Sequence, residues 1–170
     1  MIHASADRAA QDTKTRLSVD ERESGEYPKG RVRWHTLTVA IESPKGGTRK
    51  AADGSWVVHD LPAHYGYVEG TKGADNEEFD VHVVSDKIKP VWIIDQQDLE
   101  TGDFDEHKAI LGADSKAHAA DIYRRSFSDG KGDERNSHMH FMLPDEFARW
   151  VKKPGARRMP TRKELPGVID

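Results

Sequence analysis

Two short segments of the chain are rich in carboxylate side chains. EGTKGADNEEFD (69–80) contains five acidic residues, and DQQDLETGDFDE (95–106) contains six. Neighbouring carboxylates raise one another's pKa unless cations neutralise them, and hard divalent ions such as Mg²⁺ prefer oxygen ligands of this kind. The pattern predicts a divalent-metal site, with two solvated acidic loops as the alternative. An EF-hand is excluded, because its D-x-D-x-D-G loop is absent.

Basic and phenolic side chains follow the acidic segments. Lys108 ends the segment FDEHK, Arg49 and Lys50 follow a turn at 43–47, and Tyr123 and Arg124 lie on an expected helix. Cations beside clustered acids are what a metal-bound phosphate would require. The alternative is ordinary salt bridges, with Tyr123 in the core and Arg124 on the solvated surface of the helix.

A pair of histidines offers a competing metal site. His138 and His140 are two residues apart in an expected strand, so both side chains lie on one face. Two such histidines can hold zinc or iron only with a third ligand from elsewhere. A structural pair is the favoured interpretation.

Composition excludes several classes of protein. The chain has no cysteine, which excludes a disulfide scaffold, a zinc ribbon and thiol catalysis. With 26 Lys and Arg against 30 Asp and Glu, the net charge of -4 argues against general nucleic-acid binding. No apolar run approaches the roughly 18 residues of a membrane span, and the N-terminus lacks the apolar stretch of a signal peptide. A cytoplasmic protein without membrane partners is therefore expected.

Short strands must position these groups. Apolar patterning predicts strands within 32–41, 56–58, 79–84, 91–95, 109–112 and 138–142. A helix capped by Ser115 should run to about Phe127, and a shorter helix should start at Asp145. These elements predict a β-rich α+β domain over 30–153. Because only 35% of the residues are hydrophobic, a flexible charged arm is expected at 1–29 and an extended tail at 154–170.

The segment PAHYGYVEGTKGADNEEFDVHVV (62–84) resembles the signature of soluble (family I) inorganic pyrophosphatases. In that signature Y-G-Y is followed by T and then D-G-D-P-x-D-V, and the spacing from Tyr65 to Asp75 and Asp80 fits without a gap. AIESP (40–44) resembles the family's I-E-I-P strand and places Glu42 at its glutamate. The start WHTLTVAIESPKG and the segment FDEHK resemble a compact version associated with multidomain proteins of phages and mobile elements.

Two further motifs extend the resemblance to about 32–128. Glu106-His107-Lys108 is similar to the second acidic motif, and Tyr123-Arg124 is similar to a late Tyr-Lys pair. The first acid of the second motif has no ungapped match; Asp98 is preferred, with Asp103 or Asp105 as alternatives. The chain departs from the central signature where Asn76, Glu77 and Glu78 replace its Gly, Asp and Pro.

The resemblance implies a small closed β-barrel with two flanking C-terminal helices. It also implies hydrolysis of pyrophosphate to two phosphates, with Mg²⁺ as cofactor and Mn²⁺ as the alternative metal. By resemblance Glu77 orients or deprotonates the attacking water. Tyr65 and Lys108 hold phosphate and offset charge on the leaving group. The implied substrate-binding residues are Arg49, Lys50, Tyr123 and Arg124, and the implied metal ligands are Glu42, Asp75, Asp80, Asp98 and Glu106.

Two alternatives to this function stay open. The replacements at Asn76 and Glu77, with a short segment between Glu42 and Tyr65, favour a nucleotide or other phosphoanhydride as substrate of the same site. The charged ends of the chain favour a non-catalytic module that binds a phosphate ligand or a protein within a larger phage or mobile-element protein. The resemblance also allows a homo-oligomer.

Overall fold

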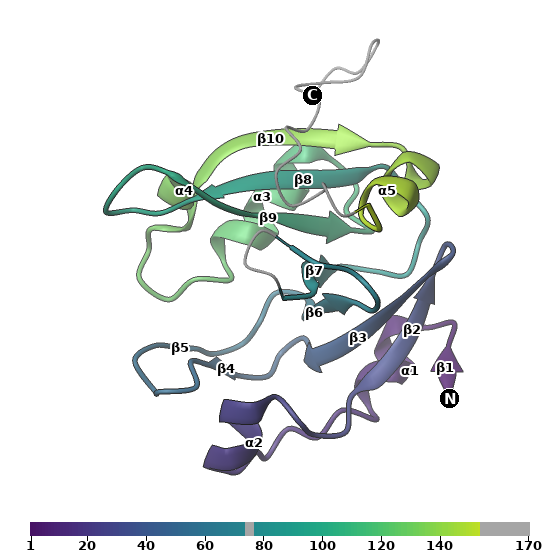
Figure 1. Ribbon diagram of the computed structural model, residues 1–170, viewed down its shortest axis with the longest axis vertical. Coiled ribbons are helices and arrows are strands. Elements are labelled where there is room, and N and C mark those ends of the chain that lie inside the picture. Colours follow the sequence, from purple (N-terminus) through teal and green to yellow (C-terminus); the bar gives the residue numbers. More distant parts are fainter. Residues whose placement is uncertain (74–76, 154–170) are drawn as a thin grey trace.

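The computed structural model describes residues 1–73 and 77–153 (Figure 1). Its main element is a mixed eight-stranded sheet of order β1-β2-β3-β6-β7-β9-β8-β10. The strands are β1 (Ile2–His3), β2 (Gly30–Trp34), β3 (Leu37–Ser43), β6 (His64–Val68), β7 (Phe79–Val83), β9 (Phe104–Leu111), β8 (Val91–Gln97) and β10 (Asn136–Met142). A second sheet pairs β4 (Arg49–Lys50) with β5 (Val57–Val58). The helices are α1 (Ala6–Ala10), α2 (Val19–Ser24), α3 (Lys116–Arg124), α4 (Gly132–Arg135) and α5 (Pro144–Trp150).

The predicted strands are confirmed, with two differences in extent. The apolar run within 32–41 folds as the β2–β3 hairpin, because the chain reverses at His35, whose φ is 54°. The strand predicted at 109–112 begins earlier, so that the acidic segment FDEHK belongs to β9 and pairs with β8. Glu106 and Lys108 therefore lie on a strand, and each side chain points to a defined face of the sheet.

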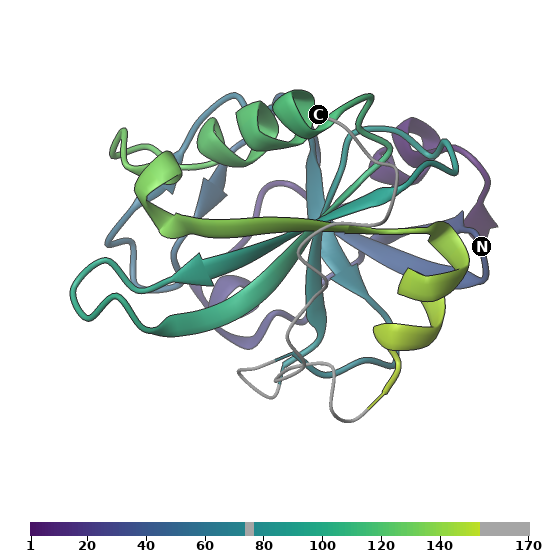
Figure 2. The ribbon, with the colours of Figure 1, turned by 90° about the horizontal axis from the view of Figure 1, so that it is seen from above.

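The β-rich α+β class is confirmed, but the predicted closed barrel is not found among the described residues. β1 and β10 are the two edges of the sheet, and each has one strand neighbour. The outer edge of β2 is occupied by β1, which pairs with it in parallel. The strands fan out around a common crossing when seen from above (Figure 2), as expected when the twist of each pair accumulates.

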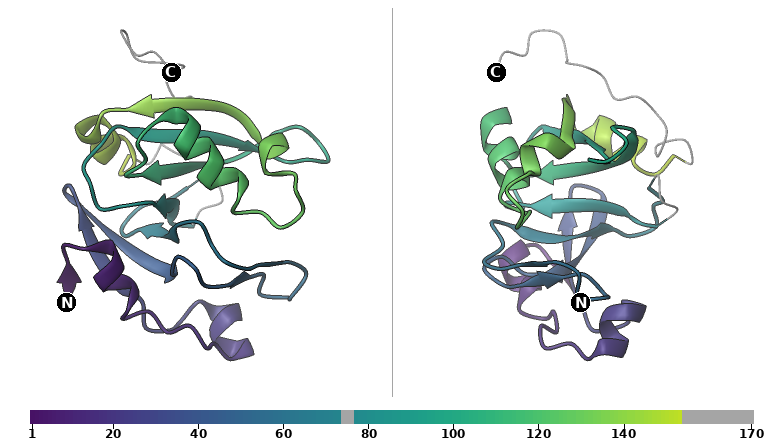
Figure 3. Two further views of the ribbon diagram at one scale, coloured as in Figure 1. Left: turned by 180° about the vertical axis from the view of Figure 1, so that it is seen from behind. Right: turned by 90° about the vertical axis from the view of Figure 1, so that its left-hand side faces the viewer.

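The two faces of the sheet pack against different helices. Ile93 and Ile94 are neighbours on β8, yet Ile93 packs with α1 and α5, while Ile94 packs with α3. Figure 3 shows α3 and α5 on opposite sides of the sheet. Both predicted C-terminal helices are confirmed. Ser115 Oγ accepts a 3.1 Å hydrogen bond from the His118 amide at the start of α3, and α5 begins at Pro144.

The N-terminal segment, expected as a flexible arm, is folded against the sheet. Ala6, Ala9 and Ala10 on α1 are buried in the core. Thr13 Oγ1 donates a hydrogen bond to the Ile41 carbonyl at 2.8 Å and accepts one from the Gly30 amide at 2.9 Å. Alanine side chains bury little area each, but their small size lets the helix approach the sheet closely. The predicted tail at 154–170 lies outside the described residues.

No helix in the described part of the chain is both long enough and apolar enough to cross a membrane.

Gly66, the glycine of the Y-G-Y segment, lies where β6 and β3 approach closely. A Cβ at Gly66 would lie 1.9 Å from the Ala40 carbonyl oxygen. Because backbone atoms block this space, Gly66→Ala must push β3 and β6 apart. We expect the substitution to lower the free energy of unfolding by about 1–3 kcal/mol, which urea denaturation would measure.

Gly47→Ala is the matched control for Gly66→Ala. A Cβ at Gly47 would lie 3.1 Å from the Pro44 carbonyl oxygen, a contact that a small local shift relieves. Equal losses in the two variants would show that the close approach at Gly66 is not what requires glycine.

Candidate active site

Lys108 is the centre of a buried polar cluster on the α3 side of the sheet. Its Nζ donates hydrogen bonds to the Tyr65 hydroxyl at 2.8 Å and to Asp80 Oδ2 at 2.7 Å. The same Nζ lies 3.3 Å from Glu106 Oε1. These side chains come from β6, β7 and β9, which are consecutive in the sheet. Glu106 and Lys108 share a face with Ile110 because side chains two residues apart on a strand point the same way.

The charges in this cluster support one another. Burial alone would lower the pKa of Lys108, but Tyr65, Asp80 and Glu106 together raise it well above its ordinary value. Burial opposes ionisation of Asp80, but Lys108 overcomes it and holds the pKa of that carboxyl below its usual range. Burial raises the pKa of Tyr65 to about 12. At neutral pH the cluster is thus an ammonium between carboxylates and a neutral phenol.

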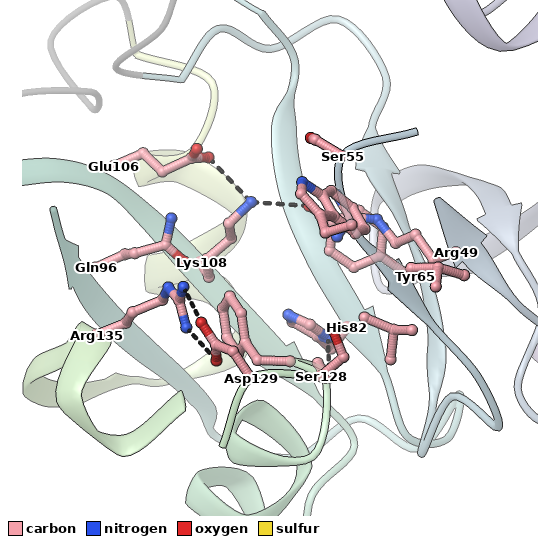
Figure 4. Close-up of a pocket in the computed structure, with 15 residues that line it drawn as sticks. Arg49, Ser55, Tyr65, His82, Gln96, Glu106, Lys108, Ser128, Asp129 and Arg135 are labelled. Atoms are coloured by element: carbon pink, nitrogen blue, oxygen red, sulfur yellow. Dashed lines mark hydrogen bonds and ion pairs between the residues drawn. The ribbon is translucent and has the colours of Figure 1, made fainter. Parts of the chain in front are cut away.

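A cavity of about 670 Å³ adjoins the cluster (Figure 4). The Arg49 guanidinium carbon stands 3.9 Å from the centroid of the Tyr65 ring and 4.9 Å from that of Trp56. Across the cavity lie Gln96 and Arg135. The lining residues are Arg49, Ser55, Trp56, Val57, Val58, Tyr65, His82, Gln96, Glu106, Lys108, Ser126, Phe127, Ser128, Asp129 and Arg135. Among the described residues, three cations therefore face one concave space from different elements: Arg49 on β4, Lys108 on β9 and Arg135 at the end of α4.

His82 contributes a neutral ring to the floor of this cavity. It is buried, and its ring centroid lies 4.9 Å from that of Tyr65. Burial, with Lys108 and Arg49, lowers the pKa of His82 to about 3. The imidazole stays uncharged at neutral pH, so it adds no positive charge to the cavity.

The structure brings together most of the sequence-predicted residues. Five of them belong to the cluster or line the cavity: Arg49, Tyr65, Asp80, Glu106 and Lys108. Glu42 lies on β3, which pairs with the strand of Tyr65, and its pKa is raised by burial and then by the charge of Asp80. The Tyr123 hydroxyl donates a 2.7 Å hydrogen bond to Gln96 Oε1, behind the cavity lining. Asp75 lies outside the described residues.

Other predicted residues stand apart from the cavity. Arg124 is exposed on α3 and pairs with Asp121, because one helical step of about 100° separates it from the inward-facing Tyr123. Lys50 is exposed next to the inward-facing Arg49, since neighbours on a strand alternate. Glu77 is exposed just before β7.

Asp98 lies in the turn between β8 and β9. Its Oδ1 accepts hydrogen bonds from the backbone amides of Glu100 at 2.8 Å and Thr101 at 3.0 Å. Of its alternatives, Asp105 is closer to the cavity lining, because its Oδ2 accepts a 2.9 Å hydrogen bond from Gln96 Nε2. The side chain of Asp98 thus serves its own turn.

The histidine pair lies in a separate network on the α5 side of the sheet. His140 Nε2 lies 2.7 Å from Asp95 Oδ2, and His107 Nδ1 lies 2.8 Å from Asp95 Oδ1. The His107 ring packs against Trp150. Within 1–73 and 77–153, no three His, Cys, Asp or Glu side chains are grouped so as to hold a metal ion. This packing favours the structural interpretation of the pair.

Several lining residues were not predicted from the sequence. Asp129 and Arg135 lie in a polar segment without a recognisable motif, and Trp56 was predicted only as part of a strand. Gln96 lies in the second acidic segment, among carboxylates that were the predicted ligands. No motif marks these residues, since the cavity is formed by elements distant in sequence.

The chain matches the family model described as Inorganic Pyrophosphatase over residues 19–152. The chain belongs to the inorganic pyrophosphatase family. It is therefore a pyrophosphatase-like hydrolase. The pyrophosphatase match extends beyond the 32–128 expected from motifs and begins inside the segment expected as an arm.

Two solved pyrophosphatase structures are similar to the chain. The enzyme from Helicobacter pylori is 22% identical, with 58% of this chain and 76% of that chain covered and a TM-score of 0.34. An inorganic pyrophosphatase from Neisseria gonorrhoeae is 15% identical, with 79% and 90% covered and a TM-score of 0.36. No curated protein matches the chain.

Glu42→Gln is expected to stabilise the metal-free protein as the pH rises. The pKa of Glu42 is raised in the folded state, first by burial and then by Asp80. The unfolded chain therefore loses this proton at a lower pH, and stability falls as the pH rises from the ordinary glutamate pKa through the raised one. Glutamine does not titrate, so the stability gap between variant and wild type should widen across that window and level off above it.

Urea unfolding at a series of pH values, with a chelator present, would measure this gap. Glu100→Gln, at an exposed position in the β8–β9 turn, is the control and should track the wild type. Parallel curves for Glu42→Gln and the wild type would contradict the raised pKa of Glu42 and the burial that causes it.

Proposed function

We propose that the cavity hydrolyses inorganic pyrophosphate to two phosphates with Mg²⁺ as cofactor. The observation that carries the proposal is the buried ammonium of Lys108, held between Asp80, Glu106 and the Tyr65 hydroxyl at the edge of a cavity that Arg49 also lines. A pyrophosphatase must bind a polyanion and offset charge on the leaving phosphate, and preorganised cations perform both tasks.

Each cation has a distinct task in this proposal. Lys108 reaches a phosphoryl oxygen from the sheet and offsets negative charge as the bridging bond breaks. Arg49, stacked on Tyr65, binds the other phosphoryl group through its planar fork of N–H donors. The Tyr65 hydroxyl, protonated at neutral pH, orients the substrate through a hydrogen bond. Glu77, exposed just before the strand that carries Asp80, would have to turn toward the cavity to orient or deprotonate the attacking water.

The carboxylates of the cluster are donors that suit a hard divalent ion, although the described residues hold no complete group of three ligands. Asp80 and Glu106 share the charge of one ammonium, and burial and then the charge of Asp80 raise the pKa of Glu42. Oxygen donors of this kind suit Mg²⁺, with Mn²⁺ as the alternative. Asp80 and Glu106, with Asp75 and Glu42, would hold the ion. When bound, the ion would supply charge compensation and lower the pKa of a coordinated water.

A nucleotide or other organic phosphoanhydride is the second candidate substrate. Trp56 lines the cavity with 40% of its surface exposed, close to the Arg49 guanidinium. An exposed aromatic ring beside a phosphate-binding cation suits a base that stacks while its phosphates bind. The cavity volume of about 670 Å³ leaves room for more than pyrophosphate.

Phosphate release from a substrate panel tests the proposal. The panel holds pyrophosphate, tripolyphosphate and nucleoside di- and triphosphates, each with millimolar Mg²⁺ and with a chelator. We expect Mg²⁺-dependent release from pyrophosphate. Fastest release from a nucleotide, lost in Trp56→Ala, would favour the second candidate instead.

A melting experiment distinguishes an inactive binding module from a chain without a site. Ligands that bind only the folded state raise Tm by mass action. At a large excess over Kd, Mg²⁺ with phosphate should raise Tm by about 5 °C or more. A shift without turnover of any substrate would favour the non-catalytic module of a larger phage or mobile-element protein. The cytoplasmic location and the homo-oligomer stay predictions.

A further inference from the structure

Arg135, at the end of α4, presents its guanidinium to the same cavity as Lys108 and Arg49. Its Nη1 and Nη2 donate to Asp129 Oδ1 at 3.0 Å and Oδ2 at 2.7 Å. Figure 4 shows Arg135 beside Gln96 on one side of the cavity, with Arg49 and Tyr65 on the other. The pair is thus part of the cavity wall rather than an isolated bridge on the outer surface.

The surroundings fix where the guanidinium stands. Its carbon lies 4.4 Å from the centroid of the Phe127 ring. Asp129 is held by its own turn, because its Oδ1 accepts a 2.9 Å hydrogen bond from the Lys131 amide. α4 docks closely on α3, since a Cβ at Gly132 would lie 2.7 Å from the Arg124 Cα. Arg135 is therefore positioned before any ligand arrives, and its side chain is only 22% exposed.

The bond to Asp129 uses the donors that a phosphate would use. Two parallel N–H groups of a guanidinium match two oxygens of a carboxylate or of a phosphate equally well. Arg124, the cation that the sequence motif suggested, points away from the cavity on α3. Arg135 supplies a cation from the neighbouring element instead.

We propose that Arg135 is an anion-binding residue of this cavity and that Asp129 is a built-in competitor that occupies it until a phosphate group displaces the carboxylate. The inference rests on the proposed function for its substrate class, a phosphoanhydride or its phosphate product. Asp129 also adds a negative charge to the cavity wall. Removing its carboxylate charge should therefore favour anion binding in two ways: the N–H donors of Arg135 become available, and the repulsion between Asp129 and the anion is lost.

Calorimetric titration of the full chain with inorganic phosphate tests this arrangement. Arg135→Gln should weaken phosphate binding by about tenfold or more, the value of a charge-assisted hydrogen bond. Asp129→Asn should tighten it by about threefold to tenfold, while the amide oxygen keeps the turn with Lys131. The double variant should bind only slightly more tightly than Arg135→Gln, because the repulsion by Asp129 is removed but no guanidinium remains to be freed. Arg135→Lys, with its charge but not its fork, should fall between wild type and Arg135→Gln.

Arg125→Gln is the matched control. Arg125 pairs with Asp121 on the surface of α3, so phosphate binding should not change. If the Arg135–Asp129 pair is purely structural, the expected result for Asp129→Asn is the opposite. Both Asp129→Asn and Arg135→Gln would then loosen the segment 129–135, lower Tm and weaken phosphate binding. That result, or wild-type affinity in Arg135→Gln, or no phosphate binding by the wild type, would overturn the inference.

Kinetics separate this inference from the proposed function. If the wild type releases no phosphate from pyrophosphate but the variants bind phosphate as expected, the proposed activity fails and the anion site stands. If the wild type is active and Arg135→Gln has an unchanged KM and phosphate Kd, the anion site fails and the activity stands.

Discussion

Replacing Lys108 with alanine is expected to lower kcat/KM for pyrophosphate by about 30- to 1,000-fold, or roughly 2–4 kcal/mol of transition-state stabilisation. Lys108 is 7% exposed, and its ammonium lies between Asp80 and Tyr65. A buried, preorganised charge needs no reorganisation as negative charge develops on the leaving phosphate. Added Mg²⁺ should not recover the lost rate, because the proposed role of the missing group is to contact substrate rather than metal.

The same substitution has a separate effect on stability. Without Lys108 the carboxylates of Asp80 and Glu106 lose the ammonium that compensates them. The metal-free variant should therefore melt at a lower temperature than the wild type, and Mg²⁺ should restore part of Tm without restoring activity. Lys89→Ala, which removes a surface ion pair with Asp114, is the control and should leave the rate unchanged. Recovery of full turnover by Mg²⁺ in Lys108→Ala would assign the lysine to metal binding or folding instead of substrate.

Asp80→Asn is expected to raise the Mg²⁺ concentration for half-maximal activity by about tenfold or more. Substituting residues that only hydrogen-bond to metal ligands already lowers metal affinity by that factor, and loss of a ligand charge should cost at least as much. Asparagine keeps the shape and an oxygen acceptor for Lys108, but it removes one negative charge from a site that must hold a divalent cation. Excess Mg²⁺ should then recover part of the activity. Rate measurements across a magnesium titration separate this outcome from the behaviour of Lys108→Ala.

The surface ion pair of Lys89 and Asp114 also provides a control for Asp80→Asn. Asp114→Asn changes the same functional group on an exposed residue that binds Lys89, and its magnesium curve should match that of the wild type. If Asp80→Asn keeps full turnover at low Mg²⁺, Asp80 serves only as the partner of Lys108, and the metal assignment is wrong.

Local spacing accounts for the features that could be predicted from the sequence. Alternating apolar residues marked the strands, and Ser115 marked the start of α3. Glu106 and Lys108 were named from their motif, but the predicted strand began only at 109, and their shared face followed from the observed start of β9 at Phe104. Tyr65 and Asp80 of the central signature lie on two adjacent strands, β6 and β7, so these two residues are close in space as well as in sequence.

Contacts between distant segments decided the rest. Which side of α3 meets the sheet decided that Tyr123 faces inward and Arg124 does not. α1 packs on the sheet through alanines, which are too small to give the segment a recognisable apolar pattern in the sequence. The close approach of the helix to the sheet nevertheless buries them in the core. Arg135 reaches the cavity because α4 docks on α3, a contact that depends on the backbone approach at Gly132. A motif records neighbours along the chain, whereas a cavity wall is formed by packing between distant segments. For that reason Arg135 and Trp56 could be assigned to the cavity only from the tertiary structure.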